Sequence, residues 1–422
     1  MEFIRRIYHK YADTKLFTIL NDIYMNGFFF ANIYANYKVR KIAQKRNDHI
    51  LPIKVAFICQ QIEAWNKLRS VFEKMLEDKR FEVVLIALEP DEEIGQGNVY
   101  SLLKKLYGKY VINGSDEMQS FDLKGWKPDY VFSNNPYDQY FPKKYRSGTI
   151  AAYAKNCYVD YGFSLSVTTL KVVLEKKYFR NIYLFFAEND FVAEYNKKRY
   201  KRAHRCGDRK TLTIGYPSFE FFYKQRISKE DDRFTIVWTP RWTEDKKLGG
   251  SNFLNFKDRF LDFSLKNQDI RFIFRPHPMT FEHFISIGKI TREEVDKYLD
   301  YFRKNDVREY DKQPDFAESF WKSDILVTDY SSVMIEYFLT GKPIIYCDTG
   351  AVLNPIVKEM CNGFYIANNW NEVEMLIKQL KEGNDPLCEL RKEIRVKLFG
   401  DDYETISQRF LDALYDDFKH IG

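Results

Sequence analysis

Three short segments of this 422-residue chain combine residue types that bind or transfer phosphoryl groups, and one of them is Arg275-Pro276-His277-Pro278. It directly follows the apolar run 270–274, which predicts a strand. The two prolines fix the backbone around His277 and keep it out of a helix. An imidazole beside a guanidinium suits a phosphate-rich ligand, because Arg is a planar charged donor and His exchanges protons near neutral pH. We therefore expect His277 to be catalytic and Arg275 to bind substrate.

A second segment, 328–336, follows an apolar run that predicts a strand and opens a predicted helix. Its serines, Ser331 and Ser332, together with the free N–H groups of the helix start, are typical of an anion site. Glu336 lies one turn further along the same helix face as Ser332, where a carboxylate can accept hydrogen bonds from a ribose diol. We expect Asp329, Ser331, Ser332 and Glu336 to bind substrate. The alternative is an ordinary helix cap and a surface ion pair.

The third segment is Trp238-Thr239-Pro240-Arg241-Trp242, at the end of the predicted strand 234–238. Ligands of open α/β sheets bind at the carboxyl ends of the strands. We therefore expect Thr239 and Arg241 to bind substrate, with Arg241 meeting a base or a phosphate. An exposed loop arginine is the alternative interpretation.

The elements that must position these segments alternate between strand and helix in two successive series. The predicted strands are 53–58, 81–88, 127–132, 234–238, 270–274, 324–328 and 343–347, and the predicted helices include 65–76, 253–265 and 332–339. Such alternation indicates parallel sheets with right-handed crossovers. The sequence therefore predicts an α/β protein with two Rossmann-like domains and a boundary near 215–217.

Composition excludes several classes of protein. Hydrophobic residues make up 45% of the chain, aromatic residues 17%, and the net charge is only +6, which excludes global disorder. No uncharged apolar stretch reaches 18 residues, and the six cysteines are scattered, which favours reduced thiols and a cytoplasmic protein. GxGxxG and GxxxxGK[ST] are absent, as is a DxD near the three segments, so we expect no cofactor and no metal. The basic residues form no pattern typical of nucleic-acid binding.

The N-terminal region carries the whole net charge. Nine Lys/Arg and three acidic residues precede position 47, and an aromatic stretch lies between residues 16 and 37. Basic flanks around an aromatic amphipathic helix suit an anionic membrane surface. The alternative is a helix that packs on the first domain with a solvated basic face.

Residues 234–350 resemble the CDP-glycerol glycerophosphotransferase family, the polyol-phosphate transferases of teichoic acid and capsule synthesis. The resemblance is carried by the segments 239–242 and 275–278, by S-D-I-L-V-T-D-Y-S-S-V at 323–333, and by G-K-P-I at 341–344. It implies a GT-B fold, with two nucleotide-fold lobes facing across a cleft, and peripheral attachment to the cytoplasmic face of the membrane. It also implies that His277, Ser331 and Ser332 contact the donor pyrophosphate and that Glu336 contacts the ribose, although the family commonly has Asp at that last position.

With that fold, the expected divisions are an N-terminal helical segment at 1–50, an acceptor domain at 51–216, a nucleotide-donor domain at 217–400 and a C-terminal helix at 401–422. In the first domain the family has a His-Gly pair that is proposed to deprotonate the acceptor. The corresponding stretch here is Tyr158-Val159-Asp160-Tyr161-Gly162, without a histidine. We take Asp160 as the candidate base and Gly162 as a candidate substrate-binding residue. The alternatives are a base elsewhere and a turn-capping aspartate.

The predicted reaction is an in-line displacement at phosphorus, in which an acceptor hydroxyl attacks the polyol phosphate of CDP-glycerol or another CDP-polyol and CMP leaves. The acceptor is a glycan or a polyol-phosphate polymer of the cell surface. Two other hypotheses stay open at this point. One is a GT-B glycosyltransferase that uses a nucleotide sugar in capsule or surface polysaccharide synthesis, and the other is a non-catalytic scaffold.

Overall fold

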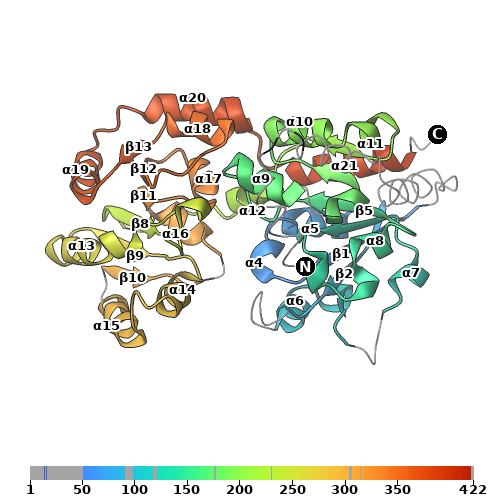
Figure 1. The fold of residues 1–422 in the computed structure, drawn as a ribbon, viewed down its shortest axis with the longest axis horizontal. Helices are drawn as coiled ribbons and strands as arrows, with labels where there is room; N and C mark the ends of the chain where they lie inside the picture. Colours follow the sequence, from blue (N-terminus) through green and yellow to red (C-terminus); the bar gives the residue numbers. More distant parts are fainter. Residues whose placement is uncertain are drawn as a thin grey trace. The chain divides into compact units, whose positions relative to one another are not determined.

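The computed structural model describes residues 14, 16, 51–90, 98–116, 121–174, 177–229, 231–303, 307–313 and 315–419. The predicted basic and aromatic segment 1–50 therefore lies outside the described residues, apart from two positions. The chain forms two compact units (Figure 1). Unit 1 contains the described parts of Met1–Gly162, Lys171–Ser218 and Thr405–Gly422. Unit 2 contains Phe163–Leu170 and the described parts of Phe219–Glu404.

Unit 1 is built on a parallel sheet whose strand order is β3-β2-β1-β4-β5-β6-β7. The strands β4, β5 and β6 are buried along their whole length, and β1 and β2 are buried at most positions, which is why most of these strands read as largely apolar runs in the sequence. The strands are β1 (Ile53–Cys59), β2 (Phe81–Ala87), β3 (Val111–Asn113), β4 (Tyr130–Ser133), β5 (Lys155–Val159), β6 (Ile182–Phe186) and β7 (Lys210–Leu212).

Helices cover both faces of this sheet. On one face Ile58 and Val131 pack with residues from α7 and α8. On the other, Phe57 packs against Phe72 of α5, and Phe186 stacks on Phe410 of α21. The helices are α4 (Ile62–Trp65), α5 (Arg69–Glu77), α6 (Val99–Tyr107), α7 (Leu123–Trp126), α8 (Ser147–Ile150), α10 (Asp190–Arg199), α11 (Lys201–Arg205) and α21 (Ile406–Lys419), with α9 (Val167–Leu174) and α12 (Pro217–Lys224) at the unit boundaries.

The C-terminal helix α21 belongs to unit 1, although the rest of that unit comes from the first half of the sequence (Figure 1). Its Asp417 is 3% exposed and accepts hydrogen bonds from Lys155 Nζ at 2.7 Å, Tyr130 Oη at 2.7 Å and Tyr183 Oη at 2.8 Å, and also from Lys210 Nζ. Burial alone raises the pKa of Asp417, but the two lysines and the phenols outweigh it and hold the pKa below its usual value. The same burial lowers the pKa of Lys155. Because Asp417 has two cationic partners, we take the ionised pair as the native state.

Unit 2 repeats the topology of unit 1. Its parallel sheet has the order β10-β9-β8-β11-β12-β13, formed by β8 (Thr235–Thr239), β9 (Arg271–Phe274), β10 (Arg308–Tyr310), β11 (Ile325–Thr328), β12 (Ile344–Cys347) and β13 (Tyr365–Ala367). Its helices are α13 (Phe253–Lys266), α14 (Thr280–Ser286), α15 (Arg292–Arg303), α16 (Ala317–Lys322), α17 (Val333–Phe338), α18 (Pro355–Cys361), α19 (Trp370–Lys381) and α20 (Cys388–Phe399).

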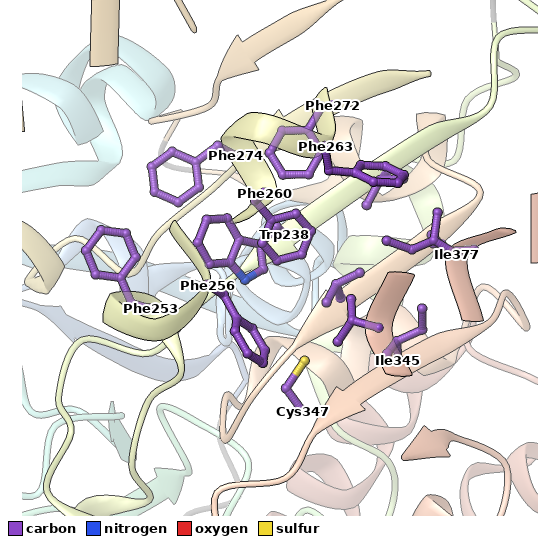
Figure 2. Packing of buried hydrophobic residues seen from close by; sticks show 14 of the residues in the cluster. Trp238, Phe253, Phe256, Phe260, Phe263, Phe272, Phe274, Ile345, Cys347 and Ile377 are labelled. Atoms are coloured by element: carbon purple, nitrogen blue, oxygen red, sulfur yellow. The ribbon is translucent and has the colours of Figure 1, made fainter. Parts of the chain in front are cut away.

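An aromatic core fills the space between this sheet and α13 (Figure 2). Trp238 of β8 stacks on Phe260 of α13, with ring centroids 4.2 Å apart, and lies beside Phe274 of β9. Ile345 and Cys347 of β12 extend the same layer. The core fixes the inner half of β8, so the residues that leave its carboxyl end start from a rigid base.

The prediction of an α/β fold with two Rossmann-like sheets is confirmed, with local differences. The predicted strand 127–132 starts only at Tyr130, because Lys127 has φ +59 and ends α7. The predicted helix 65–76 is broken between α4 and α5. The compact units also differ from the expected boundaries, since 163–170 joins unit 2 and α21 joins unit 1. Within the described ranges, every helix is too short or too polar to span a bilayer.

Candidate functional site

The three predicted segments meet at one edge of the unit 2 sheet. In this sheet β8 lies between β9 and β11, and the order of strands reverses direction between β8 and β11. That reversal is the topological switch point, where α/β sheets bind ligands beyond the carboxyl ends of their strands. Thr239 lies directly opposite Thr328 in the register of β8 and β11. The main chain of His277 donates to the Pro240 carbonyl at 3.3 Å, which brings the third segment to the same place.

Thr239 holds the strands together at this point. Its hydroxyl donates to Thr328 Oγ1 at 2.8 Å, and the residue is 4% exposed. Thr328 in turn donates to the Thr239 carbonyl at 3.1 Å. The structure thus places the predicted substrate-binding Thr239 beneath the site, as a clamp between β8 and β11.

Asp329 organises the loop that follows β8. Its carboxylate accepts hydrogen bonds from the main-chain N–H of Arg241 at 2.7 Å and of Asn252 at 3.0 Å, and from the Ser251 hydroxyl at 3.3 Å. Burial raises the pKa of Asp329 to about 6, and these hydrogen bonds oppose the rise. The predicted ligand contact of Asp329 is therefore replaced in this structure by a contact with the chain itself, because its oxygens are directed to the 241–252 loop.

Arg241 lies on that loop, with its guanidinium against the start of the Ser331-Ser332 turn. Its Nη1 donates to the Tyr330 carbonyl at 3.0 Å, its Nε donates to the Leu248 carbonyl at 2.7 Å, and the guanidinium lies 4.9 Å from the centroid of the Tyr330 ring. The loop can pack this closely because Gly249, at φ +106, has no side chain. A Cβ there would lie 2.1 Å from the Tyr330 ring.

His277 is held as a neutral hydrogen-bond donor. Its Nδ1 accepts the Met279 N–H at 3.2 Å, so the ring proton of the neutral form belongs on Nε2. Desolvation by the surrounding protein, and then the positive charge of Arg241, lower the pKa of His277 to about 4. His277 is exposed to solvent, and its free imidazole is uncharged near neutral pH. Trp242 packs nearby, with ring centroids 6.2 Å apart.

Arg275 differs from Arg241 in that a carboxylate pairs with its guanidinium. Its Nη1 forms an ion pair with Asp311 Oδ2 at 2.6 Å, and its Nη2 donates to the Gln313 carbonyl at 2.8 Å. Asp311 is almost fully buried. The structure therefore directs the predicted substrate-binding Arg275 to the loop after β10, where it fixes the base of the His277 segment.

Ser331 and Ser332 form the turn before α17. Both residues are partly exposed, and in the part of the chain that the structure describes neither hydroxyl has a hydrogen-bond partner. α17 has only six residues. Glu336 lies one turn further along and is 2% exposed. Arg241, His277 and the two serines therefore make up the group that is brought together and open to a ligand.

Unit 1 carries the other predicted residues at the carboxyl end of β5. Asp160 is 3% exposed, and its Oδ2 has no hydrogen-bond partner in the described chain. Burial raises the pKa of Asp160 to about 7, and the neighbouring Tyr158 phenol partly offsets that rise. Gly162 follows two residues later in open surroundings. A buried carboxyl that titrates near neutral pH is a recognised feature of functional sites.

The switch point of unit 1 carries a group of amides that was not predicted from the sequence. Gln60 follows β1 and Asn135 follows β4, and Asn135 Nδ2 donates to Gln60 Oε1 at 3.2 Å. Gln60 Nε2 donates to the Tyr140 carbonyl at 2.9 Å. The rule that identified the unit 2 segments, polar residues directly after an apolar strand, also applies here and was the available signal.

Comparison with known sequences identifies the family. The profile described as CDP-Glycerol:Poly(glycerophosphate) glycerophosphotransferase matches residues 127–350, which is more than half of the chain. The chain belongs to this glycerophosphotransferase family. It is also 26% identical over 167 residues to a teichoic acid glycerol-phosphate transferase of Staphylococcus aureus. That match covers 36% of this chain and 39% of the relative, so the chain matches about two fifths of that protein's length.

Several solved structures have the same fold as this chain. The wall teichoic acid polymerase TagF aligns with a TM-score of 0.54 over 95% of this chain and 98% of the polymerase, at 14% identity. A UDP-N-acetylglucosamine 2-epimerase of Listeria monocytogenes aligns with a TM-score of 0.59 over 87% of this chain and 97% of the epimerase, at 12% identity. At these identities the likeness concerns the fold alone. The resemblance predicted from the segments between residues 234 and 350 is confirmed.

Proposed function

We propose that this protein transfers a polyol phosphate, glycerol phosphate in the first instance, from a CDP-linked donor to a hydroxyl of a cell-surface glycan or a polyol-phosphate polymer. The observation that carries the proposal is the meeting of Arg241, His277 and the Ser331-Ser332 turn at the switch point of unit 2. Together they offer one cation, one neutral N–H donor and two hydroxyls to a pyrophosphate. Family membership supports CDP-glycerol as the donor.

In this mechanism the acceptor oxygen forms a bond to the phosphorus that bears the polyol. The bond from that phosphorus to the phosphate oxygen of CMP breaks, and CMP leaves with the electron pair. His277 donates from Nε2 to the pyrophosphate, and Arg241 neutralises charge that develops there. The bound anion raises the pKa of His277 from its low value in the free protein, so His277 can also protonate the leaving phosphate.

Asp160 is the proposed acceptor of the proton that the attacking hydroxyl loses. A general base works best when its pKa is close to the working pH, and burial brings Asp160 to that range. Its uncompensated Oδ2 supports the same role, because a buried carboxylate oxygen without a partner is costly unless function requires it. We propose unit 1 as the acceptor domain and unit 2 as the donor domain.

We also propose that the protein works at the cytoplasmic face of the membrane, held there by the basic and aromatic segment 1–50. Nine cationic residues against four acids in that segment support attraction to anionic lipid. Vesicle co-sedimentation of the full chain and of a variant with Arg5, Arg6, Lys41 and Lys45 changed to Gln tests this. Equal binding of both proteins to anionic vesicles would contradict it.

The central experiment measures CMP release by the purified protein from CDP-glycerol and CDP-ribitol, and nucleotide release from a panel of nucleotide sugars. Each donor is supplied with and without a poly(glycerol phosphate) acceptor. Release of CMP that depends on a CDP-polyol and on the acceptor is the expected result. Release from a nucleotide sugar alone would replace the proposal with a glycosyltransferase, and absence of both turnover and donor binding would favour a scaffold.

A further inference from the structure

A basic cavity lies on the open edge of the unit 2 sheet, away from the site at the strand ends. It has a volume of about 460 Å³ and is bounded by the edge strand β10, the start of β9 and the end of α15. Among the described residues, four basic side chains line it and Glu309 is the one acid. The basic residues are Arg271, Arg303, Arg308 and Lys312.

The charges of this cavity are only partly balanced. Arg271 pairs with Glu309 at 2.7 Å, and Arg303 pairs with the exposed Asp300 at 3.1 Å. Arg308 and Lys312 have no carboxylate partner in the part of the chain that the structure describes. The lining therefore keeps an excess of positive charge even after its internal ion pair is counted.

Arg308 is the key residue, because it is 7% exposed and yet charged. Its guanidinium donates to two carbonyls, from Nε to Tyr301 at 3.2 Å and from Nη1 to Ser264 at 3.4 Å. Burial lowers the pKa of Arg308, but the residue lines the cavity and is therefore accessible from it. A nearly buried cation that is satisfied only by neutral acceptors is stabilised when an anion enters beside it.

The neighbouring cavity provides an internal contrast. It shares Arg271 and Glu309, and its other charged lining residues are the acids Asp311, Asp315 and Glu318 against one further cation, Lys322. The Arg271–Glu309 pair thus forms part of the wall between a basic and an acidic hollow. A phosphate is attracted to the first and repelled from the second, which gives the edge of the sheet a defined place for an anion.

We propose that the basic cavity binds a phosphodiester group of a polyol-phosphate chain, at a site separate from the donor site. The choice of polyol phosphate rests on the proposed function, whereas the choice of a phosphate-bearing polyanion rests on the cavity itself. A recessed cation such as Arg308 suits a phosphate that enters a hollow, while a membrane surface is met by protruding cations. Lys312, which is exposed beside the Tyr310 ring, lies where a chain would continue outward.

The test compares two double variants in the full-length protein. Arg303→Gln with Lys312→Gln removes two cavity charges, and Lys297→Gln with Lys378→Gln removes two exposed charges of unit 2 outside the cavity. Binding of a fluorescent poly(glycerol phosphate) oligomer is measured by anisotropy at low and moderate salt. We expect the cavity variant to bind about tenfold more weakly and with a shallower salt dependence, and the control variant to bind within about twofold of the native protein.

Equal affinity of the two variants for the oligomer overturns the proposal. The proposal is also overturned if the cavity charges affect binding only to phosphatidylglycerol vesicles, because the cavity would then be a lipid site. Arg308→Lys, which retains the charge and loses the planar donor, should weaken oligomer binding less than the double variant. The binding assay does not depend on turnover. If the native protein releases no CMP but the Arg303 and Lys312 substitutions weaken oligomer binding, the proposed reaction is wrong and this binding site is still supported.

Discussion

The two sheets share one topology, and their carboxyl edges differ in chemistry. At the edge of unit 2, cationic and hydroxyl groups surround the switch point, where the Asp329 carboxylate accepts a hydrogen bond from Arg241 and the Thr239 hydroxyl donates one to Thr328. At the edge of unit 1, the groups include neutral amides and the buried carboxyl of Asp160. The fold therefore supplies the place for a ligand, and the residues after each strand decide which ligand fits.

Under the proposed function, this difference gives the two units complementary tasks. The unit 2 edge is prepared for negative charge before any ligand arrives, since Arg241 and His277 are fixed by contacts within the protein. The unit 1 edge offers few charges and a carboxyl whose protonation changes near neutral pH. The first arrangement suits a pyrophosphate and the second suits a hydroxyl that must lose a proton.

The largest predicted effect concerns the opposite edge of unit 1 and the stability of the fold. Asp417→Ala leaves Lys155 buried without its charge partner, so we expect the free energy of unfolding to fall by about 3–5 kcal/mol. Asp412→Ala is the matched control, because Asp412 lies on the same helix and pairs with Arg80 in solvent, and it should cost less than about 1 kcal/mol. Denaturant unfolding measures both, and equal costs would remove Asp417 as the anchor of α21.

The pH dependence of that anchor follows from its lowered pKa. A carboxyl whose pKa is lower in the folded than in the unfolded state contributes stability above the unfolded pKa and loses it as the pH falls through the folded value. The native protein should therefore lose stability relative to Asp417→Ala only below about pH 4. A difference between the two proteins that is already lost at pH 6 would be incompatible with this.

His277→Ala tests the unit 2 edge. Removal of a positioned donor to a transition-state charge costs about a hundredfold to a thousandfold in kcat, so we expect CMP release from CDP-glycerol to fall by that factor. His283→Ala is the control, because it removes another imidazole from the same region. His283 packs edge-on against Trp242, with ring centroids 4.9 Å apart. Its effect should stay below about tenfold. Similar losses in both variants would mean that aromatic packing, and not the His277 donor, governs the rate.

Asp160→Asn tests the unit 1 edge. The change keeps the shape and removes the proton acceptor, so turnover should fall about a hundredfold while donor binding is retained. In the native protein, kcat/KM should rise with pH through about 7 as Asp160 loses its proton, and this limb should vanish in the variant. Asp329 is also a buried carboxyl, and its pKa of about 6 is close to that of Asp160. A limb that survives in Asp160→Asn and disappears in Asp329→Asn would reassign the pH dependence to the loop anchor.

Much of this fold could be predicted from the sequence because most long strands are apolar throughout. Residues 53–58, 234–238 and 324–328 correspond to β1, β8 and β11 within one or two residues. The strand β5 was missed since Lys155 and Asn156 interrupt its apolar run. Lys155 is buried there only because Asp417 arrives from the far end of the chain. Such a partner, 262 residues away, leaves no local signal.

The position of the site could likewise be predicted, and the tasks of its residues could not. The rule of strand ends located Thr239, Asp329 and Arg275 correctly at one edge. Their side chains turn to Thr328, to the 241–252 loop and to Asp311, respectively. Sequence spacing gives the direction of a residue along a strand but says nothing of a loop that folds back over it. The supporting role of these residues therefore appears only in three dimensions.

Gly249→Ala gives the smallest predicted effect and separates preorganisation from composition. The added Cβ would meet the Tyr330 ring at 2.1 Å, so the 241–252 loop must move and take Arg241 with it. Gly288→Ala is the matched control, because Gly288 also has a positive φ of +70 but open space around its Cα. Gly288→Ala should lose about 1 kcal/mol of stability from backbone strain, and Gly249→Ala should lose more because its clash adds to the strain. Only Gly249→Ala should also weaken CDP-glycerol binding, by about tenfold in calorimetry. If the two variants bind the donor equally, the closeness of the loop to Tyr330 does not prepare the site, and the contrast between a fixed unit 2 edge and a titrating unit 1 edge loses its first half.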